Sequence, residues 1–204
     1  MIKTMKDVTF EQYKKFIYQH VPFNSTEWEL LKTLSRVEYF KKGEIIHHSG
    51  RVFDKIYFIN NGLIRAYLID PEAKDFTWNL FFNDKNSEMT NVYVVDFESF
   101  VNKSESKITF EVLEDCQLIS TTYDNLSLFY DKSKTSERFG RIMAELAYSS
   151  VHNSVINKFT KTAQERYEDL IKNSPYLLEK VPQYHIASFL GITPQSLSRI
   201  KNSL

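Results

Sequence analysis

The sequence contains little cysteine, glycine and proline. Its 204 residues include a single cysteine, Cys116, with 5 Gly and 5 Pro. One thiol excludes a disulfide framework within the chain, a four-cysteine zinc site and an iron–sulfur cluster held by this chain alone. So few glycines and prolines exclude collagen-like and linker-dominated architectures. Long apolar runs and a charged-then-apolar leader are also missing, which predicts a soluble, cytoplasmic protein without a membrane span.

Neither sign of charge is in excess over the whole chain, but the charges are unevenly distributed. Lys+Arg and Asp+Glu each number 26. Residues 1–131 carry 15 basic against 20 acidic side chains, whereas residues 132–204 carry 11 against 6. A basic C-terminal part is a weak indication of nucleic-acid contact, because solvated basic helices have the same composition. No acidic residue follows Glu179, so Arg199 and Lys201 are unopposed in the last stretch.

The apolar pattern divides the chain into helical, strand-rich and helical parts. Helical spacing predicts two helices over 9–35, the second capped at one of residues 24–26. From about 37 to 125, short β-rich runs alternate with turn residues, and Asn60-Asn61-Gly62 is typical of a hairpin turn. Eight short strands at close spacing favour a sandwich or a double-sheet roll. The expected strands are 37–40, 45–48, 55–59, 63–69, 76–82, 91–95, 108–112 and 117–122.

Residues 135–160 contain no proline and predict one long helix. Its apolar stripe is wider than a surface helix needs, so the stripe has to be buried against another surface. A two-fold-related copy of the chain would bury it, and so would packing on the chain's own β domain. A further helix is expected over 162–172, with Thr162 and Glu165 as a capping box. The stripe consists of Phe139, Ile142, Met143, Leu146, Ala147, Val151, Val155, Ile156 and Phe159.

Two short helices separated by a glycine close the sequence. We expect one helix over 183–190, a break at Gly191, where a left-handed backbone favours glycine, and a second helix over 194–203 after a Thr193 cap. This is the anatomy of a helix-turn-helix. Its predicted buried set is Ile186, Ala187, Leu190, Ile192, Leu197 and Ile200.

The second of these helices would expose a polar face. Gln195 is suited to paired hydrogen bonds with adenine, and Arg199 to guanine or a phosphate. Thr193, Ser196 and the free amides at the helix start suit a phosphate. A plain helical hairpin can also carry a polar face. A small Ala187, a glycine four residues later and a capped Thr-Pro start are more specific, and they favour DNA binding.

Motifs in order along nearly the whole chain resemble one family. The first is Phe40-x-Lys42-Gly43-Glu44-x-Ile46, followed by Gly50 and by Tyr57-Phe58-Ile59-x-x-Gly62-x-x-Arg65. The second is Glu165-Arg166-Tyr167 with Pro175, Leu177-Leu178 and Val181-Pro182, ahead of the two closing helices. In order and spacing these motifs resemble the Crp/Fnr superfamily of bacterial transcription regulators, in the short-ended form common in Bacteroidetes. The first motif is similar to the opening of that family's cyclic-nucleotide-binding β-roll.

The resemblance implies an α+β protein in three parts. These are a jelly-roll sensor domain of the cyclic-nucleotide-binding type with N-terminal helices (1–130), a long dimerisation helix (131–160) and an all-α helix-turn-helix domain lacking a full wing (161–204). The resemblance also implies a homodimer on a palindromic operator in double-stranded DNA, with its recognition helices about 34 Å apart. RNA polymerase is a further implied partner, and enzymatic activity is not expected.

Carried over from the resemblance, the base-contacting positions fall on Pro194, Gln195 and Arg199. Pro194 stands where well-known members have Arg, so we expect one base contact to be lost. No β wing follows the second helix before Leu204, which is expected to remove contacts with the DNA backbone and weaken affinity, or to move those contacts onto other basic residues. Those residues are Lys158, Lys161 and Lys180. The predicted DNA-binding residues are Thr193, Pro194, Gln195, Ser196, Ser198, Arg199 and Lys201.

The stretch 95–108 departs from the family's nucleotide pocket. Glu98 matches the ribose-binding carboxylate, but Phe97 replaces the glycine before it and would crowd the sugar. Where the phosphate-binding Arg belongs, residues 104–106 are Ser, Glu and Ser, and an anion is held poorly without a bidentate Arg. We therefore expect a small effector of unknown identity rather than cyclic AMP. The residues predicted to line this degenerate pocket are Phe97, Glu98, Ser99, Ser104, Ser106 and Lys107.

Two other functions remain open. One is a cupin-like ligand- or metal-binding β-roll, an enzyme or a sensor, whose C-terminal helices serve assembly; the other is a sensor that has lost DNA binding and engages another protein. Against a metal, the adjacent His47 and His48 point to opposite faces of a strand. Cys116 is expected to be a small buried hydrophobe. Trp78, Phe81, Phe82, Met89 and Tyr93 could line an apolar pocket, although aromatic residues at alternating strand positions more often belong to the hydrophobic core. The isolated histidines, His20, His152 and His185, are expected to be structural or surface residues.

Overall fold

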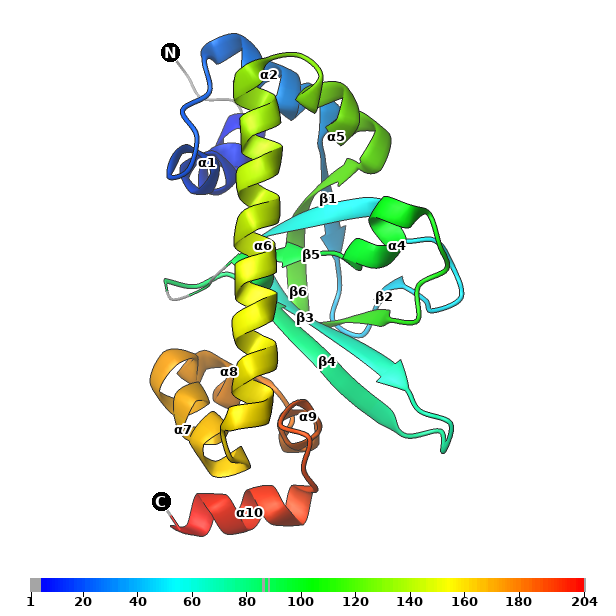
Figure 1. The fold of residues 1–204 in the computed structure, drawn as a ribbon, viewed down its shortest axis with the longest axis vertical. Helices are drawn as coiled ribbons and strands as arrows, with labels where there is room; N and C mark the ends of the chain where they lie inside the picture. The colour runs from blue at the N-terminus through cyan, green and yellow to red at the C-terminus, as the bar shows by residue number, and fades with distance from the viewer. Residues whose placement is uncertain (1–4, 86, 88, 204) are drawn as a thin grey trace.

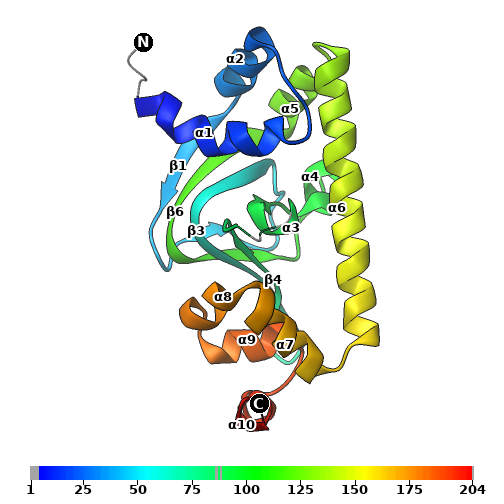
Figure 2. The ribbon, with the colours of Figure 1, turned by 90° about the vertical axis from the view of Figure 1, so that its left-hand side faces the viewer.

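Two helices precede the first strand in the computed structural model, which describes residues 5–85, 87 and 89–203. They are α1 (Met5–Tyr18) and α2 (Ser25–Leu34), and both lie over one end of the sheet (Figures 1 and 2). Of the three expected caps, Asn24 is the one used. Its side chain accepts the N–H of Glu27 at 2.9 Å, and the Glu27 carboxylate accepts the N–H of Asn24 at 2.9 Å. This capping box fixes where the second helix begins.

The sheet is an antiparallel roll built on two long strands. These strands, β3 and β6, pair from Lys55↔Thr122 to Tyr67↔Thr109. Two shorter strands pair with different parts of β6, and two others pair with different parts of β3, so the ladder bends into two layers. The predicted α+β class with a β-roll is confirmed. The strands are β1 (Arg36–Phe40), β2 (Ile45–His47), β3 (Lys55–Ile69), β4 (Asp75–Phe82), β5 (Tyr93–Val94) and β6 (Thr109–Thr122).

The prediction of a hairpin turn at Asn60-Asn61-Gly62 is wrong, because β3 continues through these residues. The register against β6 shifts between Ile59 and Ile64, which bends the strand without ending it. Gly62 has φ +107°, and a Cβ there would lie 2.3 Å from the Cys116 sulfur. The glycine therefore serves a close approach of two strands, not a turn.

Short helices interrupt the region where only strands were predicted. They are α3 (Met89–Val92) and α4 (Phe97–Asn102). Little remains of the strand expected over 91–95 besides β5. Asp96 caps α4 through the N–H of Ser99, and such a six-residue helix is too short to show a helical period in the sequence.

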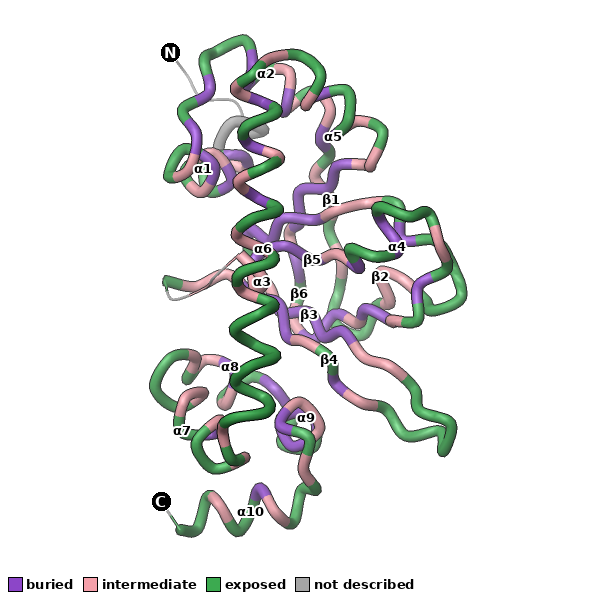
Figure 3. The backbone as a smooth tube through the Cα atoms, viewed as in Figure 1, coloured by how far each residue is buried: buried purple, intermediate pink, exposed green. Residues whose placement is uncertain are grey.

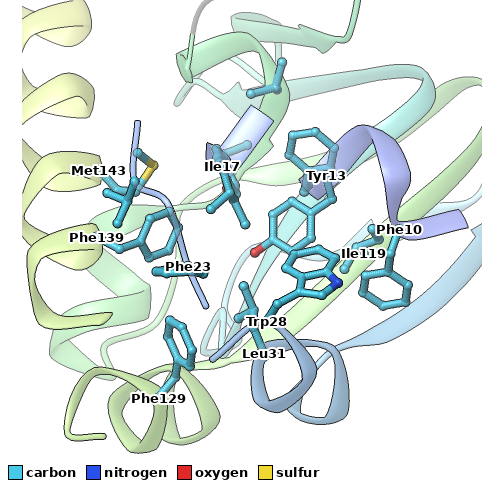
Figure 4. Packing of buried hydrophobic residues seen from close by; sticks show 14 residues of the cluster. Phe10, Tyr13, Ile17, Phe23, Trp28, Leu31, Ile119, Phe129, Phe139 and Met143 are labelled. Carbon is cyan, nitrogen blue, oxygen red and sulfur yellow. The ribbon is translucent and has the colours of Figure 1, made fainter. Parts of the chain in front are cut away.

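An aromatic cluster fills the end of the roll that α1 and α2 cover. Helix α5 (Tyr123–Tyr130) and the first half of the long helix α6 (Lys134–Thr160) complete it. The Phe139 ring lies 5.3 Å from Phe23, and Trp28 packs within 6.3 Å of Phe10 (Figure 4). This cluster buries the first half of α6 against the chain's own roll and the helices that cover it.

The C-terminal helices lie below the opposite end of the roll (Figure 2). They are α7 (Ala163–Asn173), α8 (Pro175–Lys180), α9 (Gln183–Phe189) and α10 (Pro194–Ser203). Thr162 and Glu165 form the predicted capping box at the start of α7. Leu63, Leu80 and Phe82 from the roll share one apolar cluster with these helices. The division of the chain into domains at 1–130, 131–160 and 161–204 stays a prediction. None of the helices in the described ranges combines the length and the hydrophobicity that a membrane span requires.

Candidate nucleic-acid interface

A tight turn joins α9 to α10. Helix α9 ends at Phe189, and Gly191 adopts a left-handed backbone with φ +69°, as its predicted role requires. The N–H of Ile192 donates to the carbonyl of Ala187 at 3.0 Å, which ties the turn back to the helix. Ala187 is fully buried, and its small side chain permits this close approach. The two helices therefore meet in the arrangement that the sequence predicted.

The start of α10 is capped as expected. Pro194 is the first residue of the helix, and the Thr193 hydroxyl accepts the N–H of Ser196 at 3.2 Å. Among the described residues of α10, Leu197 alone is buried, and Ile200 is partly buried beside it. The helix is thus fixed by one narrow apolar edge, and the rest of its surface faces solvent.

The predicted DNA-binding residues lie together along this outer surface. Six of the seven are exposed, and Ser196 is half-buried. Helix α10 forms one extremity of the molecule, on the side away from the roll (Figure 1). Within the described part of the chain, Arg199 and Lys201 form no ion pair, so both charges are available to an external anion. Their contact with DNA stays a prediction.

Arg166, part of a motif read from the sequence, fastens the ends of two helices. Its Nη1 donates to the carbonyl of Lys161 at 2.6 Å, and its Nη2 donates to the carbonyl of Leu190 at 2.8 Å. The first carbonyl follows α6 and the second follows α9. A planar guanidinium can bridge two sets of free carbonyls in this way. Arg166 thereby connects the long helix to the helix-turn-helix.

The three other basic residues that were expected to contact the DNA backbone already have partners within the chain. Lys158 Nζ lies 4.8 Å from the Trp78 ring centre, and burial, followed by the nearby Arg166 charge, lowers its pKa. Lys161 pairs with Asp169 at 2.6 Å. Lys180 pairs with Glu114 of the roll at 2.8 Å. Their use in DNA contact would require these pairs to be shared or exchanged.

Solved structures resemble the chain over most of its length. No protein-family model matches the sequence, and no curated protein matches it. A protein from Eubacterium rectale, described as a transcriptional regulator of the Crp/Fnr family, aligns over 96% of this chain and 87% of its own, with TM-score 0.63 and 15% identity. FixK2 from Bradyrhizobium japonicum aligns over 83% and 84%, with TM-score 0.62 and 14% identity. The c-di-GMP responsive regulator CLP of Xanthomonas campestris aligns over 88% and 91%, with TM-score 0.59 and 11% identity.

The chain has the Crp/Fnr fold. Identities this low establish the architecture alone. The fold nevertheless gives each part of the chain a place: the β-roll comes first, α6 runs from it to the C-terminal helices, and α9 with α10 has the helix-turn-helix arrangement. The resemblance inferred from the motifs is therefore confirmed at the level of the fold.

The residues expected to line the effector pocket of the Crp/Fnr fold differ in exposure, and three of them are joined by hydrogen bonds. Phe97 is 54% exposed, and Glu98 accepts a hydrogen bond from the Ser104 hydroxyl at 3.0 Å. Ser99 is buried, where it accepts the N–H of Phe53 and donates to the carbonyl of Ser104. Ser106 is also buried, bonded to the backbone of Ile108. Lys107 is exposed. Both buried serines thus hold the loop itself together.

Aromatic side chains fill the interior of the roll. The Phe53 and Phe110 ring centres are 4.8 Å apart, and Phe81 lies 5.9 Å from Phe110. Ile59, Ile64, Val112 and Leu118 complete this cluster, and each is fully buried. A nucleotide entering here would have to displace packed core, since protein interiors hold few voids larger than a water molecule.

The aromatic set considered as an apolar pocket is divided among different parts of the molecule. Phe81 belongs to the roll interior, Phe82 to the cluster under the C-terminal helices, and Tyr93 with Met89 to the cluster around α1. Trp78 is 47% exposed. These residues are therefore mostly core in three separate places.

The candidate metal and redox residues have structural surroundings. His47 is half-buried against the Phe53 ring at 4.8 Å, and His48 is exposed. Among the described residues, no group of three or more His, Cys, Asp or Glu side chains could hold a metal ion. Cys116 is 3% exposed, and burial raises its pKa to about 12, which confirms it as a small buried hydrophobe.

The second half of α6 leaves its apolar stripe uncovered. Phe139 and Met143 in the first half are buried, whereas Val155 is 41% exposed and Phe159 is 86% exposed. Figure 3 shows this change from buried to exposed along the helix. Packing on the chain's own β domain, one of the two expected partners, therefore covers the first half of the stripe. Nothing in the described chain covers the second half, and a two-fold copy as its partner stays a prediction.

Proposed function

We propose that the chain is a DNA-binding transcription regulator of the Crp/Fnr type. It would act as a homodimer, contact double-stranded DNA through α10, and respond in its roll to a small effector other than cyclic AMP. The observation that carries the proposal is the outward face of α10. Gln195, Ser198 and Arg199 lie on it, exposed, at one extremity of the molecule.

The side chains on this face are suited to reading a DNA sequence through contacts with base edges. A recognition helix places its N-terminal polar residues against base edges, and Gln195 and Arg199 lie one turn apart there. The Thr193 cap and the first free amides of α10 would meet a phosphate. RNA polymerase and a palindromic operator remain predictions that follow from the resemblance.

Dimer formation fits the bare half of α6. Tyr148, Val151, Val155, Ile156 and Phe159 are each at least 41% exposed along one helix. Monomeric proteins rarely expose so continuous an apolar surface. A two-fold copy would bury it and would place two α10 helices at the same end of the assembly.

The exclusion of cyclic AMP is supported by what fills the roll. The interior is packed with Phe53, Phe81 and Phe110, and the loop that would hold a phosphate offers no arginine. A bidentate guanidinium is the usual partner for a buried phosphate, so cyclic AMP is a poor fit.

Mobility shifts with duplexes selected from a random pool test the DNA proposal. Arg199→Ala and Gln195→Ala are each expected to weaken binding to the selected site about 5- to 100-fold, as loss of a paired base contact does. Arg51→Ala is the matched control, because Arg51 is exposed on the roll, and it should leave binding unchanged. Affinity should also fall steeply with salt. Binding that survives both substitutions would refute the proposal.

Sedimentation of the purified protein tests the dimer. Val155→Glu is expected to raise the dissociation constant at least about tenfold, because it puts a charge into an apolar interface. Ile69→Glu is the control, since Ile69 is 62% exposed at the end of β3. A wild-type protein that stays monomeric at high concentration would contradict the assignment.

A further inference from the structure

One arginine is buried where the roll meets the helix-turn-helix. Arg65 on β3 is 2% exposed. Its Nε donates to the Thr77 hydroxyl at 3.0 Å, its Nη2 lies 2.6 Å from the Asp75 carboxylate, and its Nη1 lies 3.4 Å from Glu111. The guanidinium also lies over the Tyr67 ring, 4.4 Å from its centre. All four of these partners come from the roll.

The fifth partner comes from the other side of the joint. His185 on α9 is 3% exposed, and its Nε2 lies 3.2 Å from Arg65 Nη1. A guanidinium has no acceptor, so the imidazole has to accept this hydrogen bond and must be neutral with its proton on Nδ1. Nδ1 has no hydrogen-bond partner within the described chain. The ring of Tyr184 packs beside it at 3.9 Å.

A second side chain of α9 binds the adjoining strand. The N–H of Thr77 donates to the Ser188 hydroxyl at 2.8 Å, and that hydroxyl donates to the carbonyl of Asp75 at 3.3 Å. Thr77 is itself fully buried. Its amide proton is therefore a single-residue reporter, because its protection depends on α9 remaining in place.

A proton on His185 would convert this attraction into repulsion. The protonated ring is a donor on both nitrogens and a cation, and it would face the Arg65 charge at hydrogen-bond distance. The charged groups around it are Arg65, Asp75 and Glu111, and both carboxylates are already paired with Arg65. Burial, followed by the Arg65 charge, lowers the pKa of His185 to about 4, and Asp75 opposes this only in part.

We propose that Arg65 and His185 form an acid-sensitive latch that positions the helix-turn-helix on the roll. Protonation of His185 releases α9 from β3 and β4, and α10 moves with it. The latch is a property of the folded chain alone. Only its consequence, a pH-dependent position of the DNA-binding face, rests on the proposed function.

The sign of the pH effect follows from linkage. A histidine whose pKa is lowered by docking stabilises the docked state fully above its ordinary value near 6.5, and this contribution is lost as the pH falls toward 4. Between about pH 7.5 and about pH 5, the ratio of undocked to docked chains should rise about 30-fold.

Amide hydrogen exchange by NMR on the full chain measures the latch. After correction for the intrinsic rate, protection of the Thr77 amide should fall about 30-fold over that pH range, while the Val112 amide, bonded to Glu44 within the roll, should keep its protection. His185→Gln keeps an amide at this position but cannot titrate, so its Thr77 profile should be flat. His48→Gln, at an exposed histidine, should behave as wild type.

Direct NMR titration of the His185 ring in the wild-type chain gives a reading that requires no variant to fold. A midpoint well below 6.5, together with Thr77 deprotection, supports the latch. A midpoint near 6.5 with Thr77 unchanged, or a His185→Gln chain with the wild-type pH profile, overturns it. If the Thr77 amide follows the expected pH profile while the wild-type chain does not bind DNA, the latch stands and the proposed function fails. If the wild-type chain binds DNA while the protection of the Thr77 amide does not change with pH, the proposed function stands and the latch fails.

Discussion

The two ends of the β-roll are covered by different chemistry. At the end covered by α1 and α2, the cover is an aromatic cluster of residues such as Phe10, Trp28 and Phe139. At the end facing the helix-turn-helix, leucines share the joint with polar pairs, Arg65 with His185 and Glu114 with Lys180. Apolar packing has no charges for salt to screen or for mild acid to titrate, whereas ionic contacts depend on both. The cover at the α1 and α2 end should therefore persist as salt and pH change, whereas the contacts at the helix-turn-helix end should weaken.

Helix α6 shows the same difference within one element. Phe139 in its first half is 3% exposed, and Phe159 in its second half is 86% exposed. The helix is thus part of the core at one end and an uncovered surface at the other. A single type of substitution made at these two positions separates the two roles.

The largest effect is expected from Phe139→Ala. Its ring packs against Phe23 and Phe129, so truncation leaves a cavity and should cost about 3–5 kcal/mol of unfolding free energy. For a chain of this size that corresponds to a fall in Tm of about 10 °C. Thermal and urea unfolding at low protein concentration measure it.

Phe159→Ala is the matched control on the same helix. At low concentration, where a dimer contributes least, it should change the free energy of unfolding by at most about 0.5 kcal/mol. Equal losses at the two positions would show that the second half of α6 is also packed on its own chain. The contrast drawn along the helix would then be wrong.

A smaller effect is expected from Arg65→Met at the mixed joint. Methionine fills much of the volume but loses every hydrogen bond, while Asp75 and Glu111, 41% and 28% exposed, remain partly in water. We expect a loss of about 2 kcal/mol, with the Thr77 amide deprotected and the aromatic end unchanged. Lys41→Met removes an exposed cation from the roll and should leave the Thr77 amide as it is. Deprotection at both ends would contradict a local role for Arg65.

Sequence patterns predicted the C-terminal half well because its signals are local. Capping at Thr162 and Thr193, the positive φ of Gly191 and the proline at the start of α10 each depend on a few neighbouring residues. Motif order then extended this to the Crp/Fnr fold. The outward face of α10 followed from helical periodicity alone.

The β-roll half was harder to predict, because its geometry depends on contacts between distant segments. Gly62 has a turn-like sequence, but it is needed where β3 passes Cys116 on β6. The pocket residues around Glu98 were chosen by position in a motif, and the structure shows the neighbouring serines holding the loop. His185 was expected to be a structural or a surface residue, and its partner Arg65 lies 120 residues away, a pairing that no local pattern indicates.

The smallest effect is expected from Glu114→Gln, at the more exposed polar pair of the joint. Glutamine keeps an acceptor for the Tyr176 hydroxyl but removes the charge that faces Lys180. Because Lys180 is 45% exposed, the pair is screened, and Tm should fall by only about 1–3 °C. Melting in about 0.05 M and about 1 M salt should show the difference from wild type at low salt and lose it at high salt. Phe139→Ala should keep its full effect in both. A Glu114→Gln loss that persists in high salt would mean that this end of the roll is held by packing, as the other end is.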